Sequence, residues 1–204
     1  GSIQLPDFQR GYKWDEDRIR SLLVTITLGH PLGVIMLLET GNNNVRFKPK
    51  ALEGAPDSAA ATEPDLLLLD GQQRLTSLYQ SLSGDGIVST EDARGKRVQR
   101  RFYIKIDRAL ADSSDRDEAV VSVPADGVIR TNFNRDVVLD LSTAEKERIE
   151  GYFPISLVYD PAAAMTWLLE LADKQQINRF NTEILQPMLA YEIPAIQLDR
   201  DTTK

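Results

Sequence analysis

The sequence predicts an α+β fold, a small mixed β-sheet flanked by helices, with a helical portion toward the C-terminus. Two apolar runs, residues 31–39 and 66–69, have the length of buried strands, and the second leads directly into a helical pattern. From about residue 140 to residue 190, apolar side chains recur mainly at helical spacing. With 204 residues, of which 42% are hydrophobic, the chain is long enough to bury a substantial core.

These bounds favour a single domain over residues 3–204. Its sheet-rich core is expected over about residues 3–107 and its more helical part over about residues 140–190. The first two residues have the composition of a scar left by a cleaved purification tag, because the apolar pattern begins only at Ile3.

The N-terminal part predicts a strand, a loop and a helix in that order. Residues 3–5 can extend before Pro6, and the loop FQRGYKW follows at residues 8–14. Asp15 is placed to cap a helix with an apolar stripe, and Gly29 ends that helix. The stripe consists of Ile19, Leu22, Leu23 and Ile26.

The next part predicts neighbouring strands and the turn that links one of them to a helix. Residues 31–39, PLGVIMLLE, are expected to form a strand buried on both faces, and residues 44–50 can pair beside it. Residues 52–65 contain small residues and prolines without periodicity, which predicts a surface loop. After the strand over residues 66–69, helical spacing of apolar residues continues to about Gly84.

Apolar and polar residues alternate in a later segment, which predicts a half-exposed strand. In RRFYIKI, residues 100–106, the side chains of Phe102, Ile104 and Ile106 are expected on the core face of a strand. Arg101, Tyr103 and Lys105 are expected on its exposed face.

The C-terminal part predicts helices followed by a strand. A helix opens at Asp160, and Pro187 is expected to kink or end the helical run. Residues 193–198 predict an edge strand or a strand start, because Pro194 lacks the amide that a central strand needs.

Composition excludes several classes of protein. The chain has no cysteine and one histidine, which excludes disulfides, thiolate metal sites and a histidine-metal nuclease centre. No apolar run approaches the length of a membrane span and no signal pattern opens the chain, so a cytoplasmic, bacterial location is expected. A net charge of -7 disfavours diffuse binding along DNA.

The turn DGQQR, residues 70–74, is the candidate functional site. Asp70 is expected to cap the helix by accepting from the amide of Gln72 or Gln73, worth about 1 kcal/mol. Capping does not explain two amide side chains and Arg74 in a first turn where the helix dipole favours acidic residues. Helix N-terminal N–H groups bind anions, and a guanidinium can hold phosphate through two bonds. The turn therefore predicts a phosphate receptor that includes Gly71.

A second Gln-Arg pair, Gln9 and Arg10, lies in the loop before the first helix. If this loop covers the end of the second strand, both side chains would face Arg74 and hold one polyphosphate with it. The patterns GxxxxGK[ST] and strand-GxGxxG are absent, which excludes a P-loop. A triphosphate would need a divalent metal, Mg²⁺, with Asp70 as the nearest candidate ligand.

Residues 94–105 gather six basic residues without an acidic one. This strip predicts contacts with DNA phosphates, and a solvated loop with the exposed face of a strand is the alternative. The candidate DNA-binding residues are Arg97, Arg100, Arg101 and Lys105.

Three stretches, LPDFQRGYKWDEDRIRSLL, GHPLGVIML and LLLLDGQQRLTSLYQSL, occur in this order over residues 5–83. Together they resemble the N-terminal domain family of the GmrSD modification-dependent restriction enzymes, which includes SspE-like phage-defence proteins. The resemblance implies a fold similar to the ParB and sulfiredoxin group and a DGQQR turn that binds or hydrolyses nucleoside triphosphates. The motif residues carried onto this chain are Gln9, Arg10, Asp70, Gly71, Gln72, Gln73 and Arg74.

The resemblance also implies a biological setting. Family members act in bacterial defence, sense modified phage DNA and often carry a separate HNH-type nuclease domain downstream, so a further domain is expected to follow this chain. A homo-oligomer is compatible with the sequence.

Three functions remain open from the sequence. The first is an Mg²⁺-dependent GTPase or ATPase that couples nucleotide state to sensing of modified DNA. In that function Asp70, Gln73 and Arg74 would carry the chemistry, with Gln72 or Gln73 orienting the attacking water. The second is a DNA-binding module that recognises modified DNA without hydrolysis, for a separate nuclease domain. The third is a scaffold whose later helices, over residues 160–190, dock a partner through Trp167, Leu171 and neighbouring apolar residues.

Overall fold

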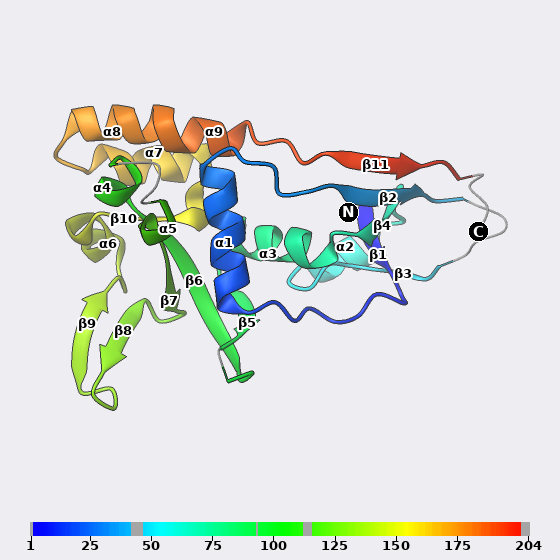
Figure 1. Cartoon of the computed structure of the whole chain (residues 1–204), viewed down its shortest axis with the longest axis horizontal. Helices are drawn as coiled ribbons and strands as arrows, with labels where there is room; N and C mark the ends of the chain where they lie inside the picture. The colour runs from blue at the N-terminus through cyan, green and yellow to red at the C-terminus, as the bar shows by residue number, and fades with distance from the viewer. Residues whose placement is uncertain (1, 42–46, 93, 112–115, 201–204) are drawn as a thin grey trace. The chain divides into compact units, whose positions relative to one another are not determined.

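A computed structural model of the chain describes residues 2–41, 47–92, 94–111 and 116–200. Helices and several sheets occur together, which confirms the predicted α+β class (Figure 1). The chain divides into two compact units that interleave along the sequence, whereas the predicted division follows sequence order. The first unit comprises Gly1–Lys13, Leu32–Tyr79 and Glu192–Lys204, and the second comprises Trp14–Pro31 and Gln80–Tyr191.

The first unit is built on a five-stranded mixed sheet, as predicted. Two pairs of neighbours run parallel, β1 with β4 and β11 with β2, while β2–β4 and β1–β3 are antiparallel. Across the sheet the strands are β11 (Ala195–Leu198), β2 (Ile35–Glu39), β4 (Leu66–Asp70), β1 (Ile3–Pro6) and β3 (Pro49–Lys50). The buried side chains Leu5, Ile35, Leu37 and Leu68 form the core of this unit.

Two details of this sheet differ from the prediction. Strand β2 begins at Ile35 rather than at residue 31, because Gly33 has a φ of +96°, outside the β region. Of the strand predicted over residues 44–50, residues 44–46 lie outside the described part. Pro49–Lys50 forms a strand that pairs with β1 rather than with β2, whose two edges pair with β4 and β11.

The edges of the sheet follow simple backbone rules. Pro194 precedes β11, and its carbonyl accepts from the amide of Ile35 at 3.0 Å, so its missing N–H leaves no gap in the ladder.

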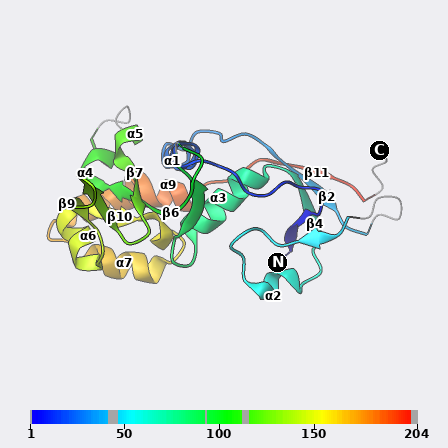
Figure 2. The same cartoon turned by 90° about the horizontal axis from the view of Figure 1, so that it is seen from below.

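The loop predicted over residues 52–65 contains a short helix, α2 (Asp57–Ala60), which Figure 2 shows set off from the sheet. The buried amide of Gln4 ties this loop to β1 by donating to the carbonyls of Ala59 and Thr62.

The second unit begins with α1 (Glu16–Thr27), which Asp15 caps as predicted by accepting from the amide of Arg18. Its main sheet places β6 at the centre, paired with β5, β7 and β10, and a separate hairpin consists of β8 and β9. The strands of the unit are β5 (Val88–Glu91), β6 (Arg97–Lys105), β7 (Val120–Pro124), β8 (Val128–Thr131), β9 (Asp136–Asp140) and β10 (Tyr152–Pro154).

Short helices complete the second unit. Asp160 caps α7 as predicted, and a π-helical turn over Asn181–Leu185 precedes Pro187, whose ring cannot complete an α-helical bond. The α-helices that follow β6 are α4 (Ile106–Ala109), α5 (Arg116–Ala119), α6 (Ala144–Glu150), α7 (Pro161–Leu169), α8 (Lys174–Phe180) and α9 (Gln186–Leu189). A 3₁₀-helix over Ile155–Leu157 precedes α7. Among the described residues, no helix has the length and apolar character that crossing a bilayer requires.

The prediction for Tyr103 is wrong: the residue is buried, with 1% of its surface exposed. Its ring packs in a cluster with Val123 and Leu141, and its hydroxyl donates to the Glu147 carboxylate at 3.2 Å. The other oxygen of Glu147 accepts from the indole N–H of Trp167 at 3.0 Å. This buried carboxylate joins β6, α6 and α7.

The buried position of Trp167 also argues against the scaffold hypothesis. The indole is 4% exposed and meets the Phe153 ring edge-on, with the ring centroids 5.2 Å apart. A side chain enclosed in this way stabilises its own unit and presents no surface to a partner.

Replacing Tyr103 with Phe is expected to lower the free energy of unfolding by about 1–3 kcal/mol at neutral pH, because the buried Glu147 carboxylate loses a donor. Burial raises the Tyr103 pKa to about 12, so the hydroxyl stays protonated and able to donate. Burial also raises the Glu147 pKa above its usual value of 4.5.

The pH dependence gives this prediction its sign. Because the folded-state pKa of Glu147 lies above the unfolded value, ionisation lowers stability as pH rises through the folded pKa. Tyr103→Phe raises that pKa further, so its cost shrinks as the pH falls. Urea unfolding at neutral pH and at a pH of about 5 measures this, with the exposed Tyr159→Phe as control. Equal losses at both pH values would contradict it.

Candidate functional site

The candidate site lies in the first unit, where β4 passes into α3 (Gln72–Leu82). Gly71 forms the turn with a φ of +96°, and its carbonyl accepts from the amide of Leu75 at 3.0 Å. Gly71 therefore occupies the capping position that the sequence predicts for Asp70, which ends β4 instead. A Cβ at Gly71 would lie 2.6 Å from the Cγ2 of Ile35, so only glycine fits the φ angle and the space.

The two glutamines of the turn hold the backbone of the loop over residues 9–13. The amide nitrogen of Gln72 donates to the Arg10 carbonyl at 2.8 Å. The Gln73 side chain accepts from the amide of Lys13 at 2.8 Å and donates to the Gly11 carbonyl at 3.3 Å. Both glutamines are buried, so these bonds satisfy polar groups that water reaches poorly.

Three further contacts fix the same loop. The Gln9 amide donates to the Leu69 carbonyl of β4 at 2.6 Å, so the loop lies against the end of this strand. Lys50 donates to the Gln9 carbonyl at 2.6 Å. The buried Tyr12 hydroxyl is hydrogen-bonded to Ser77 at 2.8 Å, and Ser77 lies one helical turn after Gln73.

Arg74 holds the segment on the other side of α3. Its Nη1 donates to the Leu32 carbonyl at 2.8 Å and its Nη2 donates to the Val34 carbonyl at 2.9 Å. A Cβ at Gly33 would lie 2.7 Å from Nη1, so this glycine permits the close approach. The Arg74 side chain is 19% exposed and forms a 3.5 Å ion pair with Asp70.

The loop over residues 9–13 and the segment over residues 32–34 are thus held to the first turn of α3 by side chains of the DGQQR turn. This point lies at the carboxyl ends of the parallel strands β1 and β4, where ligands bind in many open α/β sheets. The first N–H groups of a helix have no intrahelical acceptor. The arrangement can therefore present donors and positive charge to an anion.

The two remaining charged residues of the predicted site, Arg10 and Asp70, are exposed. Gln9 and the glutamines of the turn use their amides on backbone groups, so Arg10 is the predicted site residue of this loop whose side chain stays exposed. For a metal, the donor set at this turn is a single carboxylate, Asp70, with 73% of its side chain exposed. The described residues contain no cluster of three or more His, Cys, Asp or Glu suited to a metal ion.

The basic strip predicted to contact DNA lies on β6 in the second unit and is largely engaged within it. Arg100 pairs with Glu16 at 2.8 Å, and Lys105 donates to the Glu150 carbonyl. Arg101 is half-buried and lies near the Glu147 carboxylate. Arg97 is exposed. Arg94 and Lys96, which precede β6, are exposed as well, so the exposed basic side chains lie at the start of the strip.

Sequence reasoning missed three residues that build the site: Gly33, Lys50 and Ser77. Gly33 carried a usable signal, because a glycine between apolar residues suggests a break or a close backbone approach. The other two act through contacts at long sequence separation, which no local pattern reveals.

Comparison with known proteins supports the resemblance. The family described as the GmrSD restriction endonuclease N-terminal domain matches residues 1–154. An uncharacterized protein of Methanocaldococcus jannaschii is 26% identical over 203 residues, which covers 97% of this chain and 33% of that protein. The chain therefore spans about a third of the length of this relative.

Gly71→Ala is expected to destabilise the protein more than Gly41→Ala, a matched control with a φ of +89° whose added Cβ meets no atom within 4 Å among the described residues beyond its chain neighbours. The control costs about 1 kcal/mol through backbone strain alone. At Gly71 the clash with Ile35 adds about 1–3 kcal/mol. Denaturant unfolding measures both, and equal losses would show that the contact with Ile35 yields without cost.

Gln73→Ala is expected to speed hydrogen exchange at the Lys13 amide by about tenfold or more, since its acceptor is removed and the loop opens more readily. Gln72→Ala is the matched control, because it frees the Arg10 carbonyl and leaves the acceptor of Lys13 in place. Exchange followed by NMR or mass spectrometry distinguishes the two. The same exchange rate at Lys13 in both variants would refute the clamp assigned to Gln73.

Proposed function

Since the chain belongs to the N-terminal domain family of GmrSD restriction endonucleases, we propose that its first unit binds and hydrolyses a nucleoside triphosphate and couples nucleotide state to the sensing of modified DNA. One observation carries the proposal: Gln72, Gln73 and Arg74 fix two backbone segments around a helix N-terminus. Such pre-organisation lowers the entropic cost of binding a charged ligand.

The phosphates would lie at the first turn of α3. The N–H groups of this turn and the helix dipole attract negative charge, and Arg10 extends from a loop whose backbone is already fixed. The Arg74 guanidinium adds positive charge at the same turn, although its terminal nitrogens already bond Leu32 and Val34. In this proposal Arg10 contacts phosphate directly, and Arg74 positions the segment over residues 32–34 and contributes its field.

The chemistry would centre on Asp70. Mg²⁺ is usually held by one or two carboxylates together with substrate phosphates, and the single exposed carboxylate of Asp70 suits that mode. When bound, the ion would neutralise charge developing on the phosphates. Gln73 has both ends of its amide engaged, which favours a positioning role over the orientation of water.

DNA cleavage belongs to another part of the protein in this proposal. The 204-residue sequence has one histidine, which cannot supply the cluster of an HNH-type nuclease, so that activity would come from a separate, downstream domain. The nucleotide unit would then act as a switch that licenses cleavage of modified DNA.

A thermal-shift screen of ATP, GTP, CTP and UTP, each with and without Mg²⁺, tests the proposal. At least one triphosphate is expected to raise the melting temperature, because a ligand that binds only the folded state stabilises it. Arg10→Ala should abolish the shift and leave the melting temperature of the free protein unchanged, since this side chain is exposed. Arg74→Ala should lower the melting temperature of the free protein and also reduce the shift that the triphosphate produces.

Phosphate release by the same proteins completes the test. Asp70→Asn is expected to abolish Mg²⁺-dependent release, while Arg97→Ala, which removes an exposed arginine of the second unit, serves as the control with unchanged turnover. If the triphosphate-induced thermal shift and the phosphate release both persist in Arg10→Ala and in Asp70→Asn, the nucleotide site does not lie at this turn.

A further inference from the structure

The β8–β9 hairpin of the second unit carries an exposed aromatic residue at its tip. Phe133 lies in the connection between the two strands and is 96% exposed. Figure 1 shows the hairpin extending away from the helices of its unit. Solvent is an unfavourable environment for a full phenyl ring, so its place at a protruding tip calls for an explanation.

The backbone of the tip is strained. Asn132, Phe133 and Asn134 have φ values of 50°, 55° and 67°, a left-handed run without a glycine. Asparagine tolerates this region, whereas a bulky residue such as Phe rarely occupies it. A glycine would fit with less strain, so the presence of Phe at this position indicates a use for the ring.

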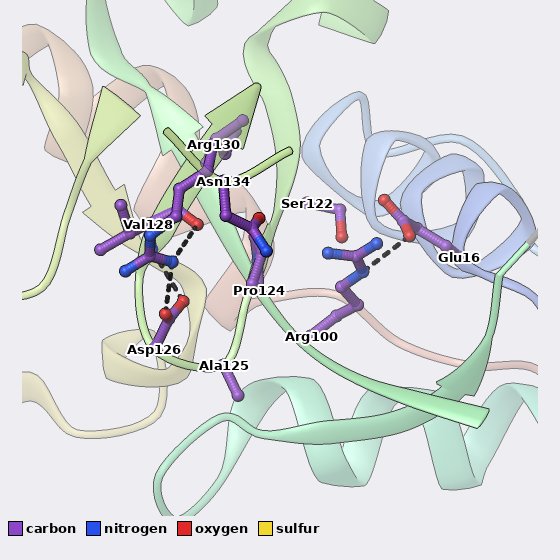
Figure 3. A pocket seen from close by; sticks show the side chains of 10 residues that line it. Glu16, Arg100, Ser122, Pro124, Ala125, Asp126, Val128, Arg130 and Asn134 are labelled. Atoms are coloured by element: carbon purple, nitrogen blue, oxygen red, sulfur yellow. Dashed lines mark hydrogen bonds and ion pairs between the residues drawn. The ribbon is translucent and has the colours of Figure 1, made fainter. Parts of the chain in front are cut away.

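A polar groove of about 550 Å³ begins beside the tip, and Figure 3 shows the side chains that line it. Arg130 and Asn134 line it from the hairpin, and Arg100 lines it from β6. Asn134, which lines the groove, directly follows Phe133 in the chain, and both residues belong to the second unit.

The groove has more hydrogen-bond donors than its own acceptors use. Arg100 gives its Nε to Glu16 at 2.8 Å, and Arg130 gives its Nη1 to Asp126 at 2.6 Å. A guanidinium carries more N–H groups than one such bond consumes. The buried hydroxyl oxygen of Ser122 has no partner among the described residues. These free donors suit a ligand rich in anionic oxygen.

Nucleic acid fits this surface better than a protein partner does. Proteins that wedge an apolar side chain between bases use Arg and Asn beside it, and here Asn132, Asn134 and Arg135 flank Phe133 in the sequence.

We propose that this hairpin contacts nucleic acid directly: the Phe133 ring stacks on a base, and the groove lined by Arg100, Ser122 and Arg130 receives phosphates of the same strand. The inference rests on the proposed function in that DNA is the partner, and it is independent of nucleotide hydrolysis. The carboxylates of Glu16 and Asp126 compete with phosphate for Arg100 and Arg130. Phosphate binding therefore stays weak until a base stacks on Phe133.

Fluorescence anisotropy with a labelled mixed-sequence DNA, as a single strand and as a duplex, tests the inference on the whole 204-residue chain. Phe133→Ala is expected to weaken binding by about tenfold or more, the usual effect of losing one stacked base, and Phe133→Trp to preserve it. Asp126→Asn is expected to bind at least about twofold more tightly, because it releases Arg130 from a partly exposed ion pair. A merely structural role would not produce that gain.

Tyr159→Ala, which removes another exposed aromatic side chain of this unit, is the matched control and should bind like the parent chain. Phe133→Gly should melt no lower than the parent, since it relieves strain, yet bind as weakly as Phe133→Ala. The inference is overturned if the parent binds neither DNA form or if Phe133→Ala binds within twofold of it. It is equally overturned if a free mononucleotide competes as well as the DNA.

Two further measurements separate this inference from its alternatives. If Phe133→Ala changes self-association in sedimentation and not DNA binding, the tip docks a second copy and the inference is overturned. The triphosphate-induced thermal shift should be the same in Phe133→Ala and the parent. DNA binding that depends on Phe133 supports the inference even if no triphosphate binds. A failure of the hairpin inference can therefore be distinguished from a failure of the proposed nucleotide site.

Discussion

The structure of the first unit depends on hydrogen bonds between polar side chains and the backbone of its loops. Loops need partners for their peptide groups, and an unmet buried group costs more than a hydrogen bond gains. A glutamine amide offers the same donor and acceptor as a peptide group, so Gln72 and Gln73 replace the missing strand partner of the loop over residues 9–13. Arg74 does this for residues 32–34, and Gly71 and Gly33 allow the close approach.

This arrangement connects architecture with proposed chemistry. A flexible loop with one arginine would bind phosphate weakly, because ordering the loop would cost entropy on binding. Once the loop is clamped, Arg10 is presented from a fixed backbone next to the first turn of α3. The same polar residues that explain the local fold therefore explain why an anion is expected there. A substitution at Arg10 should consequently affect binding without affecting stability, whereas a substitution at Arg74 should affect both.

The sequence predicts what is local and misses what depends on distant partners. The capping of α1 by Asp15 and the passage from β4 into α3 follow from periodicity and turn chemistry within a few residues. The burial of Tyr103 escapes prediction because the residues that cover it, Val123 of β7 and Leu141, lie 20 or more residues away along the chain, and the local pattern does not show that they pack there. Gln73 is unusual already in the sequence, yet its backbone partners lie about 60 residues away along the chain and could not be inferred.

Hydrogen exchange of the protein with and without a triphosphate and Mg²⁺ tests the central claim most directly. If the clamped loop and the first turn of α3 form the phosphate receptor, the amides of residues 9–13 and 71–74 should exchange more slowly in the presence of the ligand. The larger part of the β6 sheet should be unaffected. Protection confined to other segments, with unchanged exchange at this turn, would contradict the account.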